Sequence, residues 1–177
     1  MITTRNLFLV GMMGAGKTTV GRHLASRLGK VFYDTDREIE TRTGVRVAII
    51  FDVEGEAGFR KREAEVVSQT TALDNIVLAT GGGAVLDPRS REYLQTRGFV
   101  IYLHAEPRAL WQRTRNDKSR PLLQGGNSLH RLEALYQVRD PLYRGIADLV
   151  IDTGRQSVNT LLAQVLEKFS EACKLSA

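Results

Sequence analysis

The most informative stretch of the sequence lies near its N-terminus and reads Leu7-Phe8-Leu9-Val10-Gly11-Met12-Met13-Gly14-Ala15-Gly16-Lys17-Thr18. It begins with an apolar run that a glycine ends, which is typical of a short buried strand. The rest fits the pattern G-x-x-x-x-G-K-[ST], and apolar residues recur at helical spacing after Lys17. A strand, a glycine-rich loop and a helix in this order predict a cradle for phosphate groups.

The residue types of this loop suit a bound nucleotide. Glycines let the backbone turn tightly and aim its N–H groups at phosphate oxygens. In this motif the ammonium of Lys17 reaches the β- and γ-phosphates, and the Thr18 hydroxyl is a ligand for Mg²⁺. A glycine-rich turn that binds nothing is the alternative, but a match at every specified position is rare by chance. We therefore predict nucleotide binding.

Short apolar runs alternate with amphipathic stretches along the rest of the chain. Apolar runs predict further strands at 31–33, 76–79, 100–103 and 149–151. Helices are predicted at 17–28 with Gly29 as its C-cap, at 36–71 with breaks near Gly44 and Gly55, at 88–96, at 107–115, from 129 until Pro141 ends or kinks it, and from the cap Ser157 to 172. This alternation predicts a parallel α/β sheet with helices on both faces.

Length and composition favour one compact domain. The chain has 177 residues, of which 42% are hydrophobic and 25% charged, so it can bury a core. No apolar run approaches the ~20 residues of a membrane-spanning helix, and the first residues lack the regions of a secretory signal. The single cysteine, Cys173, cannot form an internal disulfide. We expect one domain over residues 1–177, in the cytoplasm and without a membrane.

The positive charge is modest and leaves two interpretations open. The net charge is +5, and no lysine-rich tail concentrates it. It indicates either a solvated surface or a site for a small anion. A nucleotide sensor or nucleic-acid-binding module is the alternative from another class, and steeply salt-dependent RNA binding would support it.

The cradle alone leaves the reaction open. A GTPase-type switch carries an N-K-x-D motif, which this chain lacks, and a molecular motor is normally longer. A small-molecule kinase needs a second pocket with a base that orients the acceptor and with anchors that bind it.

Candidates for that pocket follow the second and third predicted strands. Ligands gather at the carboxyl ends of parallel strands, where Asp34-Thr35-Asp36 and Gly81-Gly82-Gly83 are placed. One carboxylate could lie near Mg²⁺ and the other accept a proton, although Asp36 also fits a helix N-cap. The glycines allow close backbone approach to a ligand, or simply a tight turn. Arg60 has a plain alternative too, as a helix-surface partner of Glu63.

Two further features carry weaker signals. The polar stretch 116–128 is long for a connection inside a compact domain and is usually functional or disordered in such a place. The three histidines, His23, His104 and His130, are scattered, and we interpret them as structural or exposed.

Taken together, the motifs closely resemble the shikimate kinase family. The resemblance runs in order over nearly the whole chain, and its ordered set is far more specific than the nucleotide motif alone. It rests on 11–18, Asp34-Thr35-Asp36, 50–52, 54–56, Phe59-Arg60 with Glu63, Gly81-Gly82-Gly83, Arg120-Pro121-Leu122-Leu123, and Arg139 with Pro141-Leu142-Tyr143.

The resemblance implies a cytoplasmic enzyme of aromatic amino-acid biosynthesis. In that family ATP phosphorylates the 3-hydroxyl of shikimate to give shikimate 3-phosphate and ADP. The implied fold is a three-layer P-loop fold of one domain, with a five-stranded parallel sheet in the order 2-3-1-4-5 and a mobile lid at about 116–128. The substrate-binding subregion spans about 34–62. We expect a monomer that binds ATP, Mg²⁺ and shikimate and no nucleic acid.

The resemblance also implies roles for single residues. Catalysis is expected from Lys17, Asp36 and Arg120, with Asp36 as the base. The expected ATP-binding residues are Gly14, Ala15, Gly16, Lys17, Thr18, Thr19, Arg113, Arg120 and Gln156. Shikimate is expected to contact Asp36 through its hydroxyls and Arg60, Gly82 and Arg139 through its carboxylate, which suits the planar arginine fork. The implied Mg²⁺ contacts are Thr18 and, through water, Asp34.

Departures from the family pattern are few. Thr18 stands where the family often has serine, and Arg144-Gly145 stands where an acidic residue usually follows Tyr143. A gluconate kinase or a nucleoside monophosphate kinase is the nearest rival. The pair Arg60 and Arg139 beside the glycine triplet argues for a carboxylate acceptor.

Overall fold

The computed structural model describes residues 5–116, 127–154 and 156–175. Its centre is a five-stranded sheet in the order β2-β3-β1-β4-β5, in which every pair is parallel. The strands are β1 (Asn6–Val10), β2 (Val31–Asp34), β3 (Ile76–Ala79), β4 (Gly98–His104) and β5 (Leu149–Asp152). The predicted fold class and strand order are confirmed.

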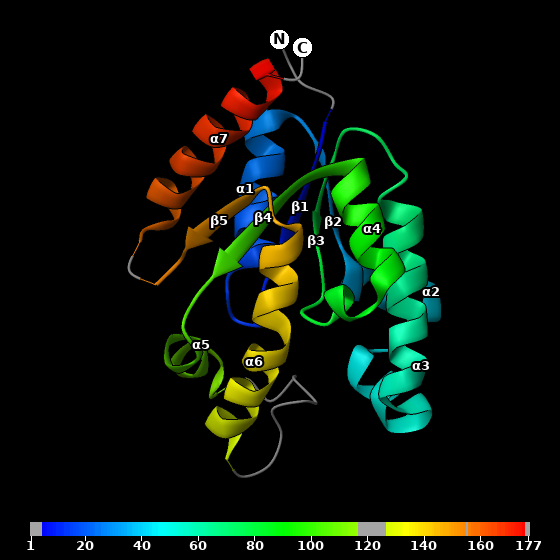
Figure 1. Ribbon diagram of the computed structural model, residues 1–177. Coiled ribbons are helices and arrows are strands. Elements are labelled where there is room, and N and C mark those ends of the chain that lie inside the picture. Colours follow the sequence, from blue (N-terminus) through cyan, green and yellow to red (C-terminus); the bar gives the residue numbers. More distant parts are fainter. Residues whose placement is uncertain (1–4, 117–126, 155, 176–177) are drawn as a thin grey trace.

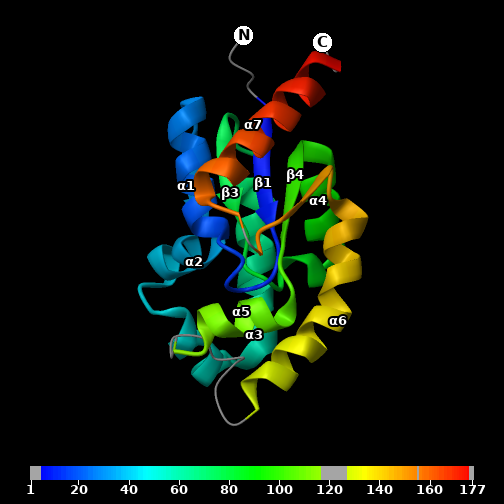
Figure 2. The ribbon, with the colours of Figure 1, turned by 90° about the vertical axis from the view of Figure 1, so that its left-hand side faces the viewer.

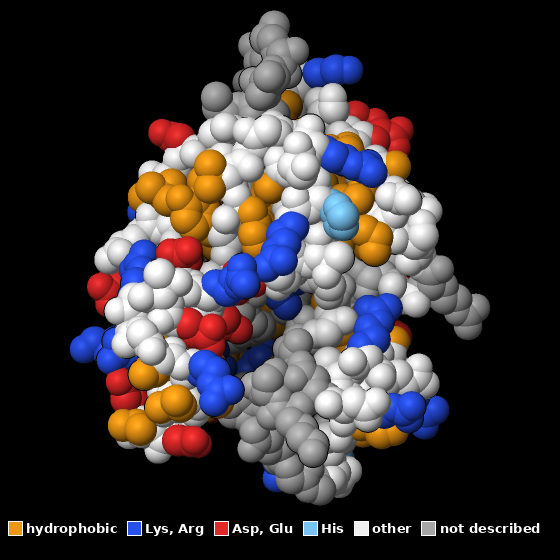
Figure 3. Space-filling view, turned by 180° about the vertical axis from the view of Figure 1, so that it is seen from behind, with side chains coloured by type: hydrophobic (Ala, Val, Ile, Leu, Met, Phe, Trp, Pro, Cys, Tyr) orange, Lys and Arg blue, Asp and Glu red, His pale blue; other side chains and the backbone are white. Residues whose placement is uncertain are grey.

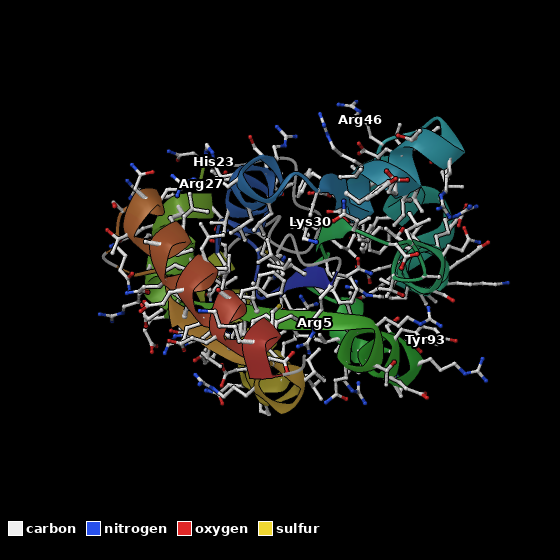
Figure 4. The ribbon with its side chains drawn as sticks, turned by 90° about the horizontal axis from the view of Figure 1, so that it is seen from above. Arg5, His23, Arg27, Lys30, Arg46 and Tyr93 are labelled. Atoms are coloured by element: carbon white, nitrogen blue, oxygen red, sulfur yellow. The ribbon has the colours of Figure 1, made fainter. Side chains whose placement is uncertain are left out.

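Helices cover both faces of the sheet, so the architecture has three layers (Figures 1 and 2). On one face α1 (Lys17–Leu28) contacts α7 (Val158–Leu175). The opposite layer holds α3 (Val47–Thr70), α4 (Pro88–Arg97) and α6 (Ser128–Ile146), of which α4 contacts both neighbours. Viewed along the strands, the two helical layers flank the sheet (Figure 4). The remaining helices are α2 (Thr35–Thr43), α5 (Pro107–Thr114) and the 3₁₀ turn η1 (Ala84–Leu86).

Burial of the strands explains the short apolar runs in the sequence. Every residue of the inner strands β1, β3 and β4 is buried, whereas the edge strands β2 and β5 are partly exposed. Strands covered on both faces need apolar side chains at successive positions. A second, small cluster, formed by Ile39, Ile50, Phe59 and Val66, joins α2 to α3 beside the main core.

Most predicted boundaries are confirmed. Left-handed glycines follow α1 and α2, at Gly29 and Gly44. Gly55 interrupts α3 with a φ of 70°, which accounts for the predicted break. The Ser157 hydroxyl accepts a hydrogen bond of 3.1 Å from the Thr160 N–H and so caps α7 as predicted.

Two features differ from the prediction. The turn η1 follows the glycine triplet and was not predicted, since its three residues are too few to show a period. Helix α6 continues through Pro141 to Ile146, so of the two outcomes predicted at this proline, an end to the helix is wrong. The face that buries Arg139, Tyr143 and Ile146 runs past the proline, so packing outweighs the lost backbone hydrogen bond.

Among the described residues, no helix is long and apolar enough to cross a membrane.

Candidate active site

A cavity of about 360 Å³ opens at the carboxyl ends of β1, β2 and β3. Its walls come from the glycine-rich loop, the start of α1, the turns after β2 and β3, and α5. The lining residues are Met13, Gly14, Gly16, Lys17, Thr18, Thr19, Asp34, Asp36, Thr80, Gly81, Gly82, Arg113 and Thr114. The structure therefore brings most of the predicted site residues to one place.

The glycine-rich loop holds its lysine close. The Lys17 ammonium donates to the carbonyl oxygens of Gly11 at 2.7 Å and Met12 at 2.8 Å, and the residue is 9% exposed. Gly14 and Gly16 have φ values of 81° and 95°, which residues with a side chain rarely adopt. The loop backbone thus needs its glycines in order to wrap around the start of α1.

Asp34 links the loop to the second strand. One carboxylate oxygen accepts from the Thr18 hydroxyl at 2.7 Å, and the other accepts from the N–H groups of Asp36 and Arg37 at 3.1 and 3.4 Å. Asp34 is therefore the N-cap of α2, so the alternative that Asp36 caps this helix is wrong. Asp36 is left exposed in the first turn and faces the cavity.

The glycine triplet receives side chains from two other helices. A Cβ added at Gly83 would collide with the Arg60 guanidinium, and one at Gly81 would collide with the Glu63 carboxylate. At Gly82 it would lie 3.3 Å from an Arg139 nitrogen. The triplet thus leaves room for the close approach of Arg60, Glu63 and Arg139, whereas its predicted approach to a ligand stays a prediction.

Arg60 pairs with Glu63, as helical spacing allowed, but the glutamate is buried and Arg60 is only partly exposed. Arg60 Nη1 lies 2.6 Å from Glu63 Oε2, and its other nitrogens donate to Glu56 at 3.2 and 3.0 Å. Glu63 is only 2% exposed. Burial raises the pKa of Glu63, while the Arg60 charge opposes the rise. Glu63 thus fixes Arg60 against the glycine triplet.

Arg139 approaches the triplet from α6 and is 2% exposed. Next to it, the buried Tyr143 hydroxyl donates to the Gly82 carbonyl oxygen. Burial raises the pKa of Tyr143, so this hydroxyl stays protonated and remains a donor. The roles of Tyr143 and of Thr35, which accepts from the Gly81 N–H at 2.7 Å, were not predicted. A tyrosine or threonine inside a motif carries no sign of its hydrogen-bond partner.

On the nucleotide side, Arg113 spans two loops. It donates to the Gly14 carbonyl at 3.3 Å and to the Thr153 carbonyl at 2.8 Å. Gln156 is exposed just beyond β5. Arg120 and most of the predicted lid lie outside the described residues.

Among the residues described, no group of three or more His, Cys, Asp or Glu side chains is placed to hold a metal. The pair Thr18 and Asp34 nevertheless fits Mg²⁺, which keeps several waters and binds one or two protein groups together with substrate phosphates. Seen from behind, Lys and Arg side chains gather across the middle of the molecular surface, beside acidic ones (Figure 3).

Comparison with known proteins identifies the family. The family model described as shikimate kinase matches residues 13–170. A shikimate kinase of Thiobacillus denitrificans is 63% identical over 86% of this chain and 84% of its own length. One of Burkholderia lata is 62% identical over 91% and 88%.

Solved structures agree. A shikimate kinase from Acinetobacter baumannii in complex with shikimate superposes with a TM-score of 0.93 at 47% identity, over 96% of this chain and 95% of that one. A gluconokinase from Sinorhizobium meliloti reaches only 0.60 at 14% identity, over 97% and 94%, a likeness of fold alone. The chain belongs to the shikimate kinase family.

Proposed function

We propose that this chain, an ATP-dependent kinase by its family, transfers the γ-phosphoryl group of ATP to the 3-hydroxyl of shikimate, giving shikimate 3-phosphate and ADP. The observation that carries the proposal is the convergence of Arg60 and Arg139 on the glycine triplet, of which Gly81 and Gly82 line the cavity together with Asp36 and the glycine-rich loop. Two guanidinium groups suit the one carboxylate of shikimate.

The nucleotide half uses the loop and its two neighbours. Backbone N–H groups from Gly14 to Thr19 cradle the phosphates at the start of α1, where the helix dipole adds positive charge. Lys17 exchanges its carbonyl partners for phosphate oxygens. Arg113 and Gln156 flank the base, and Arg120 reaches the phosphates from the lid at 116–128.

The acceptor half uses Asp36 and the two arginines. Asp36 accepts hydrogen bonds from shikimate hydroxyls and takes the proton of the attacking one. Arg60, Arg139 and the Gly82 N–H bind the carboxylate. Glu63 holds Arg60 in place, so the carboxylate of shikimate binds to a guanidinium group that is already oriented.

The metal is assigned to the protein groups that suit it. Thr18 and Asp34, the latter through water, are the residues that would hold Mg²⁺. When bound, the ion neutralises charge on the phosphates. We further infer a single domain over residues 1–177 with a substrate subregion at about 34–62. A monomer in the cytoplasm without nucleic-acid or membrane partners stays a prediction.

The experiment that tests the function is ADP release with shikimate, gluconate, AMP or no acceptor in parallel. Shikimate alone should support turnover well above the rate without acceptor. Equal rates with gluconate or AMP would contradict the assignment of the acceptor. A protein that retains RNA in filter binding, with a steep salt dependence and no acceptor-stimulated turnover, would instead favour the nucleic-acid-binding alternative.

Replacing Arg139 by lysine should weaken shikimate binding selectively. Lysine keeps the charge but loses the planar fork, so KM for shikimate should rise about tenfold to hundredfold, with KM for ATP little changed. Steady-state kinetics with each substrate varied in turn measure both. Arg89→Lys, at an exposed position of α4, is the matched control. A shift in the ATP KM alone would reassign Arg139 to the nucleotide.

Gly83→Ala should also act on shikimate binding. The new methyl group would overlap the Arg60 guanidinium, which must then move away from the carboxylate site. We expect KM for shikimate to rise about tenfold and the melting temperature to fall, because a displaced Arg60 no longer matches the buried Glu63 carboxylate. Gly145→Ala is the control, because a Cβ there meets nothing within 4 Å. An unchanged shikimate KM in Gly83→Ala would show that the position of Arg60 does not limit binding.

A further inference from the structure

His104, the last residue of β4, lies between α6 and β5. Its side chain is 9% exposed. Nδ1 lies 3.1 Å from Asp152 Oδ2 on β5, and Nε2 lies 2.8 Å from the Tyr136 hydroxyl on α6. The interpretation of His104 as structural or exposed did not include its contact with β5.

One tautomer satisfies both ring nitrogens. An ionised carboxylate only accepts hydrogen bonds, so Nδ1 carries the proton and donates to Asp152. Nε2 then accepts from the hydroxyl of Tyr136, whose pKa is raised chiefly by burial. The pKa of Asp152 is lowered, first by the Gly154 N–H and further by His104, so its carboxylate is ionised.

The contact matters because Asp152 shapes the segment that follows β5. Its second oxygen accepts from the Gly154 N–H at 2.7 Å. The His104 carbonyl accepts from the Thr153 N–H at 2.7 Å and from the Thr153 hydroxyl at 3.0 Å. Arg113 donates to the Thr153 carbonyl from the other side, at 2.8 Å. The backbone of 152–154 is thus held between His104 and Arg113.

We propose that His104 is a positioning residue for the nucleotide: through its hydrogen bond to Asp152 it fixes the 152–154 backbone beside the base of ATP. This inference rests on the proposed function, which places the base next to Arg113 and Gln156. The imidazole does not line the cavity. It acts on nucleotide affinity by keeping the loop in its binding conformation before ATP arrives.

Other charged groups surround the ring, so the test uses changes of hydrogen bonding at constant pH. Glu106 lies 3.9 Å from Nε2. On α6, Asp140 bonds Arg144 at 2.9 Å and the Tyr102 hydroxyl at 2.7 Å, so its charge is already compensated.

Two amide variants of His104 separate the contacts of its two ring nitrogens. Asparagine places an N–H donor near Nδ1, and glutamine places its amide near Nε2.

The experiment compares His104→Asn with His104→Gln. His104→Asn keeps a donor to Asp152, so KM for ATP should stay within about twofold of normal. His104→Gln loses that donor, so KM for ATP should rise about fivefold to tenfold. KM for shikimate and kcat should stay near normal in both. His23→Asn is the matched control, since His23 is exposed on α1 (Figure 4).

Binding of a fluorescent ADP analogue without acceptor gives a second readout. The dissociation constant should rise in His104→Gln and not in His104→Asn, and this holds even if shikimate proves not to be the acceptor. An equal rise in both variants, no rise in either, or a parallel rise in KM for shikimate would overturn the proposal. Melting temperatures of the two variants separate any loss of folding from these outcomes.

Discussion

Lys17→Met should lower kcat by at least about 100-fold while the protein stays folded. The ammonium is 2.7 and 2.8 Å from two carbonyl oxygens of the loop, so it is held at the loop that we propose cradles the phosphates of ATP. Its interaction with the transferring phosphoryl group is strongest in the transition state, so its loss acts on turnover more than on substrate binding. Methionine keeps an unbranched side chain of nearly the same length and removes the charge and the donors.

Shikimate-dependent ADP release measures the effect, and far-UV circular dichroism with a thermal melt verifies the fold. Lys168→Met is the matched control, because Lys168 is an exposed residue of α7 that pairs with Glu171 at 2.9 Å. It should retain full activity. A folded Lys17→Met enzyme with near-normal kcat would remove Lys17 from the mechanism.

The fold class could be predicted because buried strands and helix faces require apolar residues at regular positions in the sequence. The inner strands are covered on both faces and read as apolar runs, and the glycines that end α1 and α2 are visible as glycines. The strand order, by contrast, came from the family resemblance. Whether Pro141 ends α6 or only kinks it could not be decided from the sequence, because the packing of Tyr143 and Ile146 beyond the proline decides it.

Site residues that belong to a sequence motif could be predicted. Contacts that depend on burial or on the arrangement of the strands could not. Lys17 and Thr18 follow from loop spacing. Arg60 and Glu63 stand three residues apart, which indicates a pair but not that Glu63 is 2% exposed. His104 and Asp152 are 48 residues apart and meet only because β4 and β5 are neighbours.

Replacing Asp36 by asparagine should lower shikimate-dependent turnover by at least about 100-fold, since it removes the proposed general base while keeping the shape of the side chain. Asp36 is exposed to the cavity, and Asp34, not Asp36, caps α2, so the change should leave that helix intact.

Binding of an ATP analogue to Asp36→Asn should stay near normal, because the contact with Thr18 belongs to Asp34 and is unchanged. The two readouts, turnover and analogue binding, separate the acceptor side of the cavity from its nucleotide side. Asp74→Asn, at an exposed position after α3, is the matched control and should change neither. If Asp36→Asn loses analogue binding in proportion to turnover, Asp36 serves the nucleotide or its metal, and the base must be sought elsewhere in the cavity.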